Sequence, residues 1–147
     1  MKKVLVFGTF DLLHPGHVSF LKQAKKQGDF LITVVACDHT VKKLKEFWPH
    51  QNEKERLLNV KKLKIVSKVI LGKHNLRKKY DIIEKIKPDI ICLGYDQQFF
   101  INDLPKVLKK LKLKTKVIRL KPFKPRQFKS SIIKKLLPNK KHSAKLK

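Results

Sequence analysis

Two histidines, His14 and His17, stand three residues apart in the segment Gly8–His17, which reads GTFDLLHPGH. The apolar run Lys2–Gly8 leads into this segment and is typical of a buried strand. Two imidazoles on either side of a Pro-Gly pair can point at one anion, and the amides at the start of a following helix favour phosphate. The pattern predicts a site that stabilises the negative charge that develops when a nucleoside triphosphate loses pyrophosphate.

A zinc site is the alternative interpretation of this pair, because histidines three apart also bind zinc. No third ligand is evident nearby in the sequence, and the pair sits in a loop setting rather than along one helix. The two cysteines, Cys37 and Cys92, each end an apolar run, so we expect them to be small core residues without a disulfide. The sequence therefore predicts no metal site built from protein side chains alone.

Alternating strands and helices must position the histidine segment. Apolar runs without polar alternation predict buried strands, and amphipathic runs with capping signals predict helices. The expected strands are Lys2–Gly8, Phe30–Cys37, Ser67–Gly72, Asp89–Gly94 and Thr115–Leu120. The expected helices are His17–Asp29, Asn52–Leu63, Arg77–Pro88, Ile101–Leu113 and Ser130–Leu137, and a loop that can open with a short helix is expected over Asp38–Gln51.

This alternation predicts an α/β fold, a Rossmann-like doubly wound parallel sheet of five strands with helices on both faces. In such folds, ligands bind at the carboxyl ends of the strands. The histidine segment follows the first strand, and a lysine-rich stretch follows the second, so both are expected at that edge of the sheet. We expect one domain over residues 1–137 and a short basic, disordered tail over residues 138–147.

The charge of the chain is strongly positive, because 37 basic and 11 acidic residues give a formal net charge of +26. Such a surface attracts polyanions, so a nucleic-acid-binding module without turnover is one alternative function. Nucleic acid is nevertheless not the expected partner, because the lysines are spread along the chain without interleaved aromatics and arginine is scarce. The longest apolar run, Phe30–Cys37, is too short to cross a bilayer and no apolar signal region opens the sequence, so we expect a cytoplasmic protein without membrane contact.

The string GTFDLLHPGH resembles the HxGH signature of the nucleotidyltransferase superfamily, in particular its cytidylyltransferase-like branch. Further matches follow in order up to about Leu137: DHTVKKLK (Asp38–Lys45) is similar to the lysine-bearing loop of that family, and EKERL (Glu53–Leu57) to its E-x-x-R helix start. FKSSII (Phe128–Ile133) resembles its closing S-[ST]-x-I motif. LGYDQ (Leu93–Gln97) resembles archaeal-type FAD synthases, because glycerol-3-phosphate cytidylyltransferases typically carry two acids and a tryptophan there.

The resemblance implies an enzyme that transfers AMP from ATP to FMN and releases pyrophosphate. It implies ATP and FMN as substrates, with a divalent cation such as Mg²⁺ accompanying ATP. The alternative enzyme is a cytidylyltransferase that acts on glycerol-3-phosphate or a similar phospho-alcohol. Members of the family are often dimers, so a homodimer is an open expectation.

The resemblance also implies roles for individual residues. Catalytic roles fall on His14, His17 and a lysine after the second strand, with Lys43 and Lys45 both open. ATP contacts are implied for Gly8, Thr9, Phe10, His14, Pro15, Gly16, His17, Asp96, Arg126, Ser130 and Ser131. Acceptor contacts are implied for Asp11, Arg56 and Tyr95. The segment KPRQFKSS departs from the family, which commonly has an arginine-glycine segment before the closing serines.

Three of these residues have a second interpretation. Asp11 can help to hold a magnesium ion or can cap the turn. Arg56 can contact a phosphate or can be a charge on the surface of its helix. Tyr95 can stack on a base or flavin or can belong to the core. The remaining histidines are expected to face solvent without a cluster of partners: His39, His50, His74 and His142.

Overall fold

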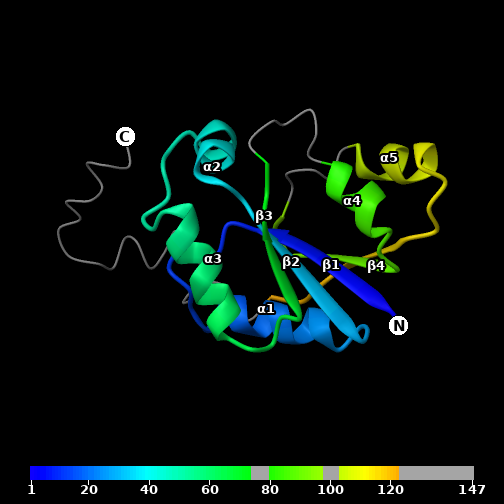
Figure 1. The fold of residues 1–147 in the computed structure, drawn as a ribbon, viewed down its shortest axis with the longest axis horizontal. Helices are drawn as coiled ribbons and strands as arrows, with labels where there is room; N and C mark the ends of the chain where they lie inside the picture. The colour runs from blue at the N-terminus through cyan, green and yellow to red at the C-terminus, as the bar shows by residue number, and fades with distance from the viewer. Residues whose placement is uncertain (74–79, 98–102, 123–147) are drawn as a thin grey trace.

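Five parallel strands form the central sheet of the molecule, in the order β3-β2-β1-β4-β5 (Figure 1). The computed structural model describes residues 1–73, 80–97 and 103–122. The predicted fold class is confirmed, and each predicted strand is present with ends shifted by at most two residues. The strands are β1 (Lys3–Gly8), β2 (Phe30–Val35), β3 (Lys68–Leu71), β4 (Ile90–Leu93) and β5 (Lys116–Arg119).

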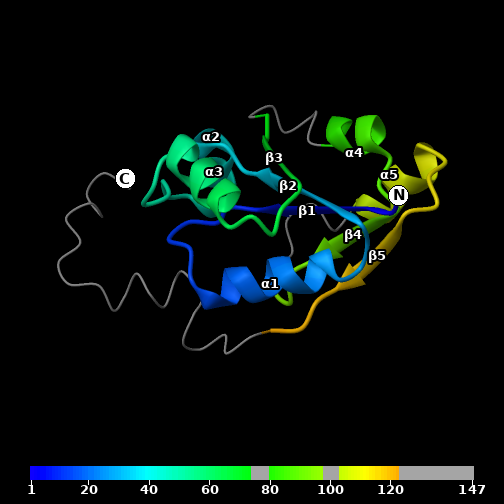
Figure 2. The ribbon, with the colours of Figure 1, turned by 60° about the horizontal axis from the view of Figure 1, so that its bottom comes forward.

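Helices cover both faces of the sheet because residues along each strand point alternately to opposite sides. Val4 and Val6 of β1 belong to a core cluster with α1 and α3, whereas Leu5 packs in a second cluster with α4 and α5. Figure 2 shows α1 on one side of the sheet and α4 and α5 on the other. The helices are α1 (Pro15–Lys25), α2 (Asp38–Lys45), α3 (Glu53–Lys62), α4 (Asp81–Ile86) and α5 (Leu104–Lys110).

The ends of α1 differ from the prediction at both sides. The helix begins at Pro15, two residues early, because His14 caps it. It ends at Lys25 rather than Asp29, since Gly28 lies against β1. A Cβ atom at Gly28 would stand 2.8 Å from the Lys2 carbonyl oxygen, so only glycine lets the chain pass there into β2.

The stretch Asp38–Gln51, predicted as a loop that can open with a short helix, opens with the two-turn helix α2. The Glu53 carboxylate accepts a hydrogen bond from the Asp38 amide at 2.8 Å, so a distant residue satisfies the first turn of this helix. Glu46 ends α2 with a left-handed backbone, φ 63°. The predicted cap of α3 is confirmed as a capping box between Asn52 and Glu55.

The strand order places the expected ligand site between β1 and β4. The chain leaves β3 at one edge of the sheet and returns on the far side of β1, so the crevice outside the carboxyl ends of β1 and β4 is the switch point of the fold. Within the described ranges, no helix has both the length and the apolar character needed to cross a membrane. The helix predicted over Ser130–Leu137 and the tail lie outside the described residues.

Candidate active site

The segment between β1 and α1 has an unusual backbone. Phe10 and Leu12 adopt left-handed conformations, with φ 53° and 54°, which cost non-glycine residues on the order of 1 kcal/mol or more each. Neighbouring groups hold the segment in place. The Asp11 carboxylate accepts hydrogen bonds from the amides of His50 at 2.8 Å and Gln51 at 2.9 Å, and the Leu12 amide donates to Gln51 Oε1 at 3.1 Å.

These contacts give Asp11 a structural role and correct the prediction for His50. Asp11 is only 3% exposed and both of its oxygens accept backbone hydrogen bonds, so it caps the segment. His50 was expected to face solvent, but its ring lies 3.7 Å from the Asp11 carboxylate with 5% of the side chain exposed. The aspartate anchors the His50 backbone, and this contact brings the ring inside.

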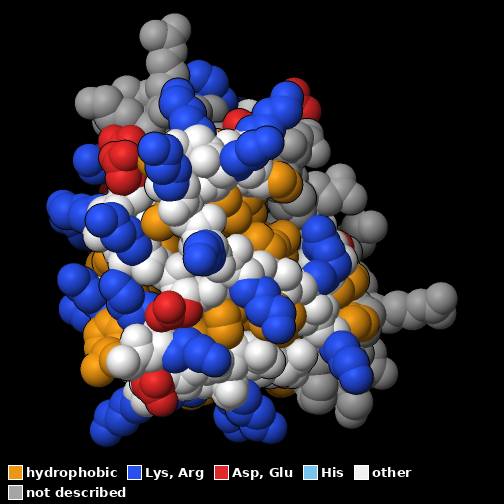
Figure 3. Space-filling view, turned by 90° about the vertical axis from the view of Figure 1, so that its right-hand side faces the viewer, with side chains coloured by type: hydrophobic (Ala, Val, Ile, Leu, Met, Phe, Trp, Pro, Cys, Tyr) orange, Lys and Arg blue, Asp and Glu red, His pale blue; other side chains and the backbone are white. Residues whose placement is uncertain are grey.

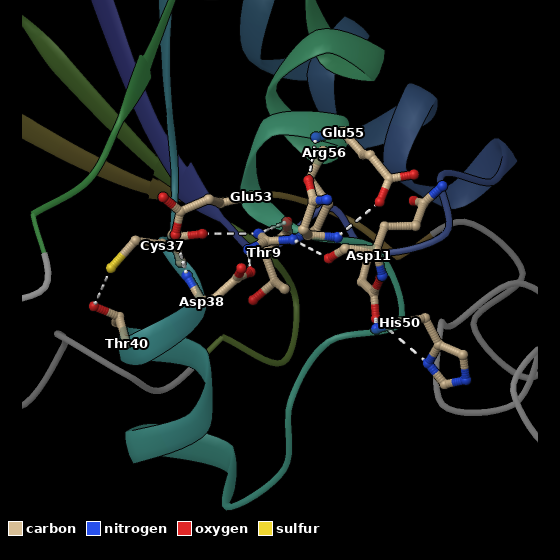
Figure 4. Close-up of polar contacts among 12 residues, drawn as sticks. Thr9, Asp11, Cys37, Asp38, Thr40, His50, Glu53, Glu55 and Arg56 are labelled. Atoms are coloured by element: carbon tan, nitrogen blue, oxygen red, sulfur yellow. Dashed lines mark hydrogen bonds and ion pairs between the residues drawn. The ribbon is translucent and has the colours of Figure 1, made fainter. Parts of the chain in front are cut away.

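Arg56 is fully buried and donates to four oxygens of the protein. Its Nε donates to the Gln51 carbonyl at 3.0 Å, and Nη1 donates to the carbonyls of Thr9 and Ala36, both at 2.8 Å. Nη2 forms an ion pair with Asp38 at 2.7 Å. We call Asp11, Asp38, Gln51 and Arg56 the Arg56 brace (Figure 4).

The brace corrects the interpretation of Arg56. The residue is neither a surface charge nor placed to contact an acceptor, because its guanidinium joins the ends of β1 and β2 to the start of α3. The E-x-x-R resemblance located an important residue but not its role. A buried arginine with matched acceptors organises the loops that carry the site.

His14 is the N-cap of α1. Its Nδ1 accepts a hydrogen bond from the Gly16 amide at 3.1 Å, and its carbonyl accepts from the amides of His17 at 2.9 Å and Val18 at 3.2 Å. Pro15 occupies the first turn, where a missing N–H costs nothing. The amides of Gly16, His17 and Val18 at the start of α1 thus all have partners within the segment.

The rings of the two histidines stack, with centroids 3.9 Å apart and planes inclined by 25°. Burial lowers the pKa of His14 to about 4. Burial, followed by the nearby charges of His14 and Lys45, lowers the pKa of His17 to about 3, against a smaller opposing effect of Asp11. Both rings are therefore neutral near pH 7. Because His14 Nδ1 accepts a hydrogen bond, the proton of its neutral ring is on Nε2. We call His14 and His17 the histidine pair.

The ring of Phe10 supports the histidine pair. It lies edge-on to His17 with centroids 5.6 Å apart and is 3% exposed. A Cβ atom on Gly8 would come within 2.6 Å of the Phe10 ring. The Phe10 ring therefore belongs to the core, and the missing side chain of Gly8 makes room for that ring. His17 Nδ1 is buried and has no hydrogen-bond partner among the described residues.

The structure separates the two candidate lysines. Neighbours two apart on a helix point about 200° away from each other. Lys45 is partly buried, and its charge is close enough to His17 to lower the pKa of that ring. Lys43 is exposed. Of the two lysines, only Lys45 is placed to act together with the histidine pair.

The turn Gly94–Gln97 after β4 is fixed from two sides. Gln97 Oε1 accepts from the Gly94 amide at 3.1 Å, and its Nε2 donates to the Phe7 carbonyl at 3.1 Å, which ties the turn to β1. From β5, Arg119 Nη1 donates to the carbonyls of Gly94 at 2.7 Å and Gln97 at 3.1 Å, with that of Tyr95 at 3.4 Å. We call Gln97 and Arg119 the turn clamp.

The turn clamp leaves Asp96 exposed at the carboxyl edge, while Tyr95 is partly buried. The sequence did not predict that Gln97 and Arg119 fix this turn. A lone arginine at the end of the last strand was the available signal for Arg119. The predicted contacts Arg126, Ser130 and Ser131 lie outside the described residues, and within those residues no three His, Cys, Asp or Glu side chains are grouped to hold a metal.

Comparisons with known proteins identify a family and several relatives of this chain. A family described as cytidylyltransferase-like matches residues 5–136. An FAD synthase of Aciduliprofundum boonei is 45% identical over 123 residues, which are 84% of this chain and 80% of the relative. An FAD synthase of Ferroglobus placidus is 47% identical over 125 residues, 82% of this chain and 77% of the relative. A solved structure of a lipopolysaccharide core biosynthesis protein from Thermoplasma volcanium is 38% identical, with a TM-score of 0.77 over 84% of this chain and 98% of that one.

Proposed function

The chain belongs to the cytidylyltransferase-like family, and on that basis we propose that it is an FAD synthase that transfers AMP from ATP to FMN and releases pyrophosphate. The observation that carries the proposal is its 45% identity to an FAD synthase over 84% of the chain. The family and the enzyme class predicted from the HPGH and LGYDQ strings, a nucleotidyltransferase, are confirmed by these relatives.

In this reaction, an oxygen of the FMN phosphate attacks the α-phosphorus of ATP. The bond from that phosphorus to the bridging oxygen breaks, and pyrophosphate leaves with the electron pair. Catalysis then depends on positioning and on donors aimed at the developing charge. The neutral rings of the histidine pair are suited to donate hydrogen bonds there, because a neutral imidazole keeps one N–H group that can donate to a phosphate oxygen.

Lys45 supplies the positive charge that the neutral histidines lack. Its ammonium lies close enough to His17 to influence that ring, so a phosphate bound at the histidine pair would meet both groups. A divalent cation such as Mg²⁺ would arrive on the triphosphate oxygens as part of the substrate, since Mg²⁺ prefers oxygen ligands and keeps several of its waters. Thr9 at the end of β1 and Asp96 in the clamped turn are the proposed contacts to the rest of ATP.

The proposal is tested by supplying the protein with FMN and Mg²⁺ together with either ATP or CTP, and separating the flavins by chromatography. We expect FAD and pyrophosphate to form in equal amounts with ATP, and no new flavin with CTP. A parallel reaction with CTP and glycerol-3-phosphate tests the alternative enzyme. Consumption of CTP there, with FMN unchanged in the ATP reaction, would overturn the proposal.

A further inference from the structure

Exposed lysines gather at the edge of the sheet opposite to the histidine pair. In a parallel sheet with helical crossovers, strand starts and helix ends meet at one edge. The starts of three strands carry Lys2, Lys68 and Lys116, and the ends of three helices carry Lys26, Lys62 and Lys87. We call these six residues the basic edge. Figure 3 looks at this side of the molecule, where Lys and Arg side chains far outnumber those of Asp and Glu.

The acidic residues are distributed in the opposite way. At the strand starts, the described residues offer Asp29 and Asp89, whose carboxylates accept hydrogen bonds from the amides of Lys2 at 2.8 Å and Lys3 at 2.7 Å. Many of the other acids stand in the first turns of helices, at the catalytic edge: Asp38, Glu53, Glu55, Asp81 and Glu84. At the strand starts, two carboxylates therefore stand against the six lysines of the basic edge.

Neither substrate attraction nor helix dipoles account for this arrangement. Lysines that draw ATP would stand at the catalytic edge, where potential focuses on the site. A helix end carries about half a negative charge, which one lysine offsets. Lys2, Lys68 and Lys116 stand on strand starts, where the sheet has little net dipole to offset. The basic edge is thus a group of positive charges that the candidate site and the helix dipoles do not explain.

We propose that the basic edge binds the phosphate backbone of a double-helical nucleic acid. Strands about 4.8 Å apart make a five-stranded edge roughly 20 Å wide, and duplex phosphates follow each other about every 3.4 Å along one strand, so several lysines can meet phosphates at once. Lysine ammonium groups act as point charges on phosphate and read no base sequence. The partner is recognised by its charge and shape.

Two features favour a duplex over other polyanions. In the described part of the chain, the exposed large hydrophobic side chains are Met1, Phe47, Leu58 and Val117, and the one aromatic among them, Phe47, follows α2 on the catalytic side. The basic edge therefore lacks the stacking rings on which single strands bind. Met1 and Val117 alone do not form the apolar stripe of a membrane-surface helix.

From the sequence alone, nucleic acid is not the expected partner, because the lysines are spread along the chain. The fold collects them, since strand starts and helix ends that are far apart in sequence share one edge. This surface lies across the sheet from the histidine pair, so a bound duplex leaves the catalytic edge open. We therefore expect nucleotide transfer to continue while the protein is bound.

The test measures binding of a 20-base-pair DNA duplex and a matching RNA duplex by fluorescence anisotropy at several KCl concentrations. The variant with Lys26, Lys68 and Lys116 changed to Gln should lower the slope of log affinity against log salt for DNA by about 3, because each lost phosphate contact removes about 0.9. A control variant changes Lys54, Lys106 and Lys121 to Gln, which are exposed residues away from the basic edge. It should keep the slope of the unchanged protein.

Equal losses in the two variants would show diffuse attraction by net charge and overturn the proposal, as would the absence of duplex binding at 0.1 M KCl. Binding to phosphatidylserine vesicles with none to either duplex would assign the edge to a membrane instead. The duplex should also leave the kcat and the KM for ATP in FAD synthesis unchanged, and competition with ATP would place the nucleic acid at the catalytic edge. Only this last measurement rests on the proposed function, so a protein that makes no FAD still tests the binding.

Discussion

The Arg56 brace and the histidine pair stand side by side at the end of β1, yet they use their polar groups in opposite ways. Arg56 donates to four protein oxygens, and Asp11 accepts through both of its own. In the histidine pair, by contrast, His17 Nδ1 is buried with no hydrogen-bond partner among the described residues. The hydrogen-bonded groups of the brace hold the loops, whereas His17 Nδ1 is available to a ligand.

The sequence motifs mark Arg56 and the histidines alike as site residues, but their hydrogen-bond partners distinguish a structural residue from one that can bind a ligand. Leaving a buried polar atom without a partner costs about 1–3 kcal/mol, which a folded protein carries only where something offsets it. A phosphate that accepts from the imidazoles would recover that cost on binding. Substitutions in the Arg56 brace and in the histidine pair test this difference. Those in the brace should give the largest effect.

Replacing Arg56 with Met should lower the free energy of unfolding by about 3–5 kcal/mol, the scale for breaking a buried charge pair. Three carbonyls and Asp38 would lose their donor together. Arg56→Lys should not restore stability, since one ammonium cannot reach all four oxygens. Urea unfolding followed by circular dichroism measures this, and a stable Arg56→Met protein with a reduced kcat would return Arg56 to the substrate site.

On the other side, His17→Gln and His14→Asn should each reduce kcat by roughly 100- to 1,000-fold, the effect of losing one donor to a developing oxyanion. Asparagine is a strong N-cap, so His14→Asn keeps the start of α1 while removing the Nε2 donor. The free energy of unfolding should stay within about 1 kcal/mol of the original. A large loss of stability with kcat retained would mean that the histidine pair has a structural role and not a catalytic one.

Lowering the pH distinguishes the two regions, because it affects the protonation of the histidine pair and leaves Arg56 charged. The pKa values of His14 and His17 are lowered from 6.5 to about 4 and about 3, so below pH 6.5 the unfolded chain takes up protons that the folded chain refuses. The free energy of unfolding is therefore highest above pH 6.5 and falls on acidification toward pH 4, by at most about 1.4 kcal/mol per pH unit for one fully shielded histidine.

Urea unfolding at pH 7 and pH 5 checks this expectation. The double variant His14→Asn/His17→Gln should show a smaller difference between the two pH values than the unchanged protein. An equal difference in both proteins would mean that other groups carry the acid sensitivity and that the rings are not shielded.

Lys45→Met should raise the KM for ATP about tenfold, the effect of one hydrogen bond to a charged group. Lys43→Met is the matched control and should change this KM less than twofold, because its side chain is exposed on another face of α2. Steady-state kinetics with varied ATP separates them. Equal effects would indicate general attraction by charge rather than a specific contact beside the histidine pair.

The turn clamp should give the smallest effect, because Arg119 is exposed and its hydrogen bonds compete with water. Arg119→Met should raise the KM for ATP about three- to tenfold at unchanged kcat, and should speed hydrogen exchange at the Gly94 amide. Arg119→Lys should restore both values, since an ammonium also donates to several carbonyls. If the lysine variant behaves like the methionine variant, the carbonyl contacts are not what matters.

The strands and the order of elements could be predicted because their signals are local in the sequence. Examples are the apolar run of β2 and the capping box at Asn52. The length of α2 could not, since Glu53 satisfies its first amide from beyond the loop. The role of Arg56 was equally hidden, because the carbonyls of Thr9 and Ala36 that surround it leave no mark in the sequence.

Within the site, the histidine pair was visible from spacing, but its surroundings were not. Lys43 and Lys45 differ only in the side of α2 that they occupy. This difference could not be predicted, because the sequence indicates mainly a loop over that stretch. His50 is inside because Asp11 binds its backbone across 39 positions of the chain. Local patterns reveal which residues are unusual, and long-range contacts decide what they do.

His14 both caps α1 and belongs to the histidine pair, so helix stability and turnover make different demands on this one position. Asparagine, aspartate and serine are better helix caps than histidine, so any of them could raise the melting temperature. Each would also remove a donor from the reacting phosphates. A library selected only for heat resistance should therefore lose this histidine and collect inactive survivors, whereas selection for growth that depends on the enzyme's activity should keep it.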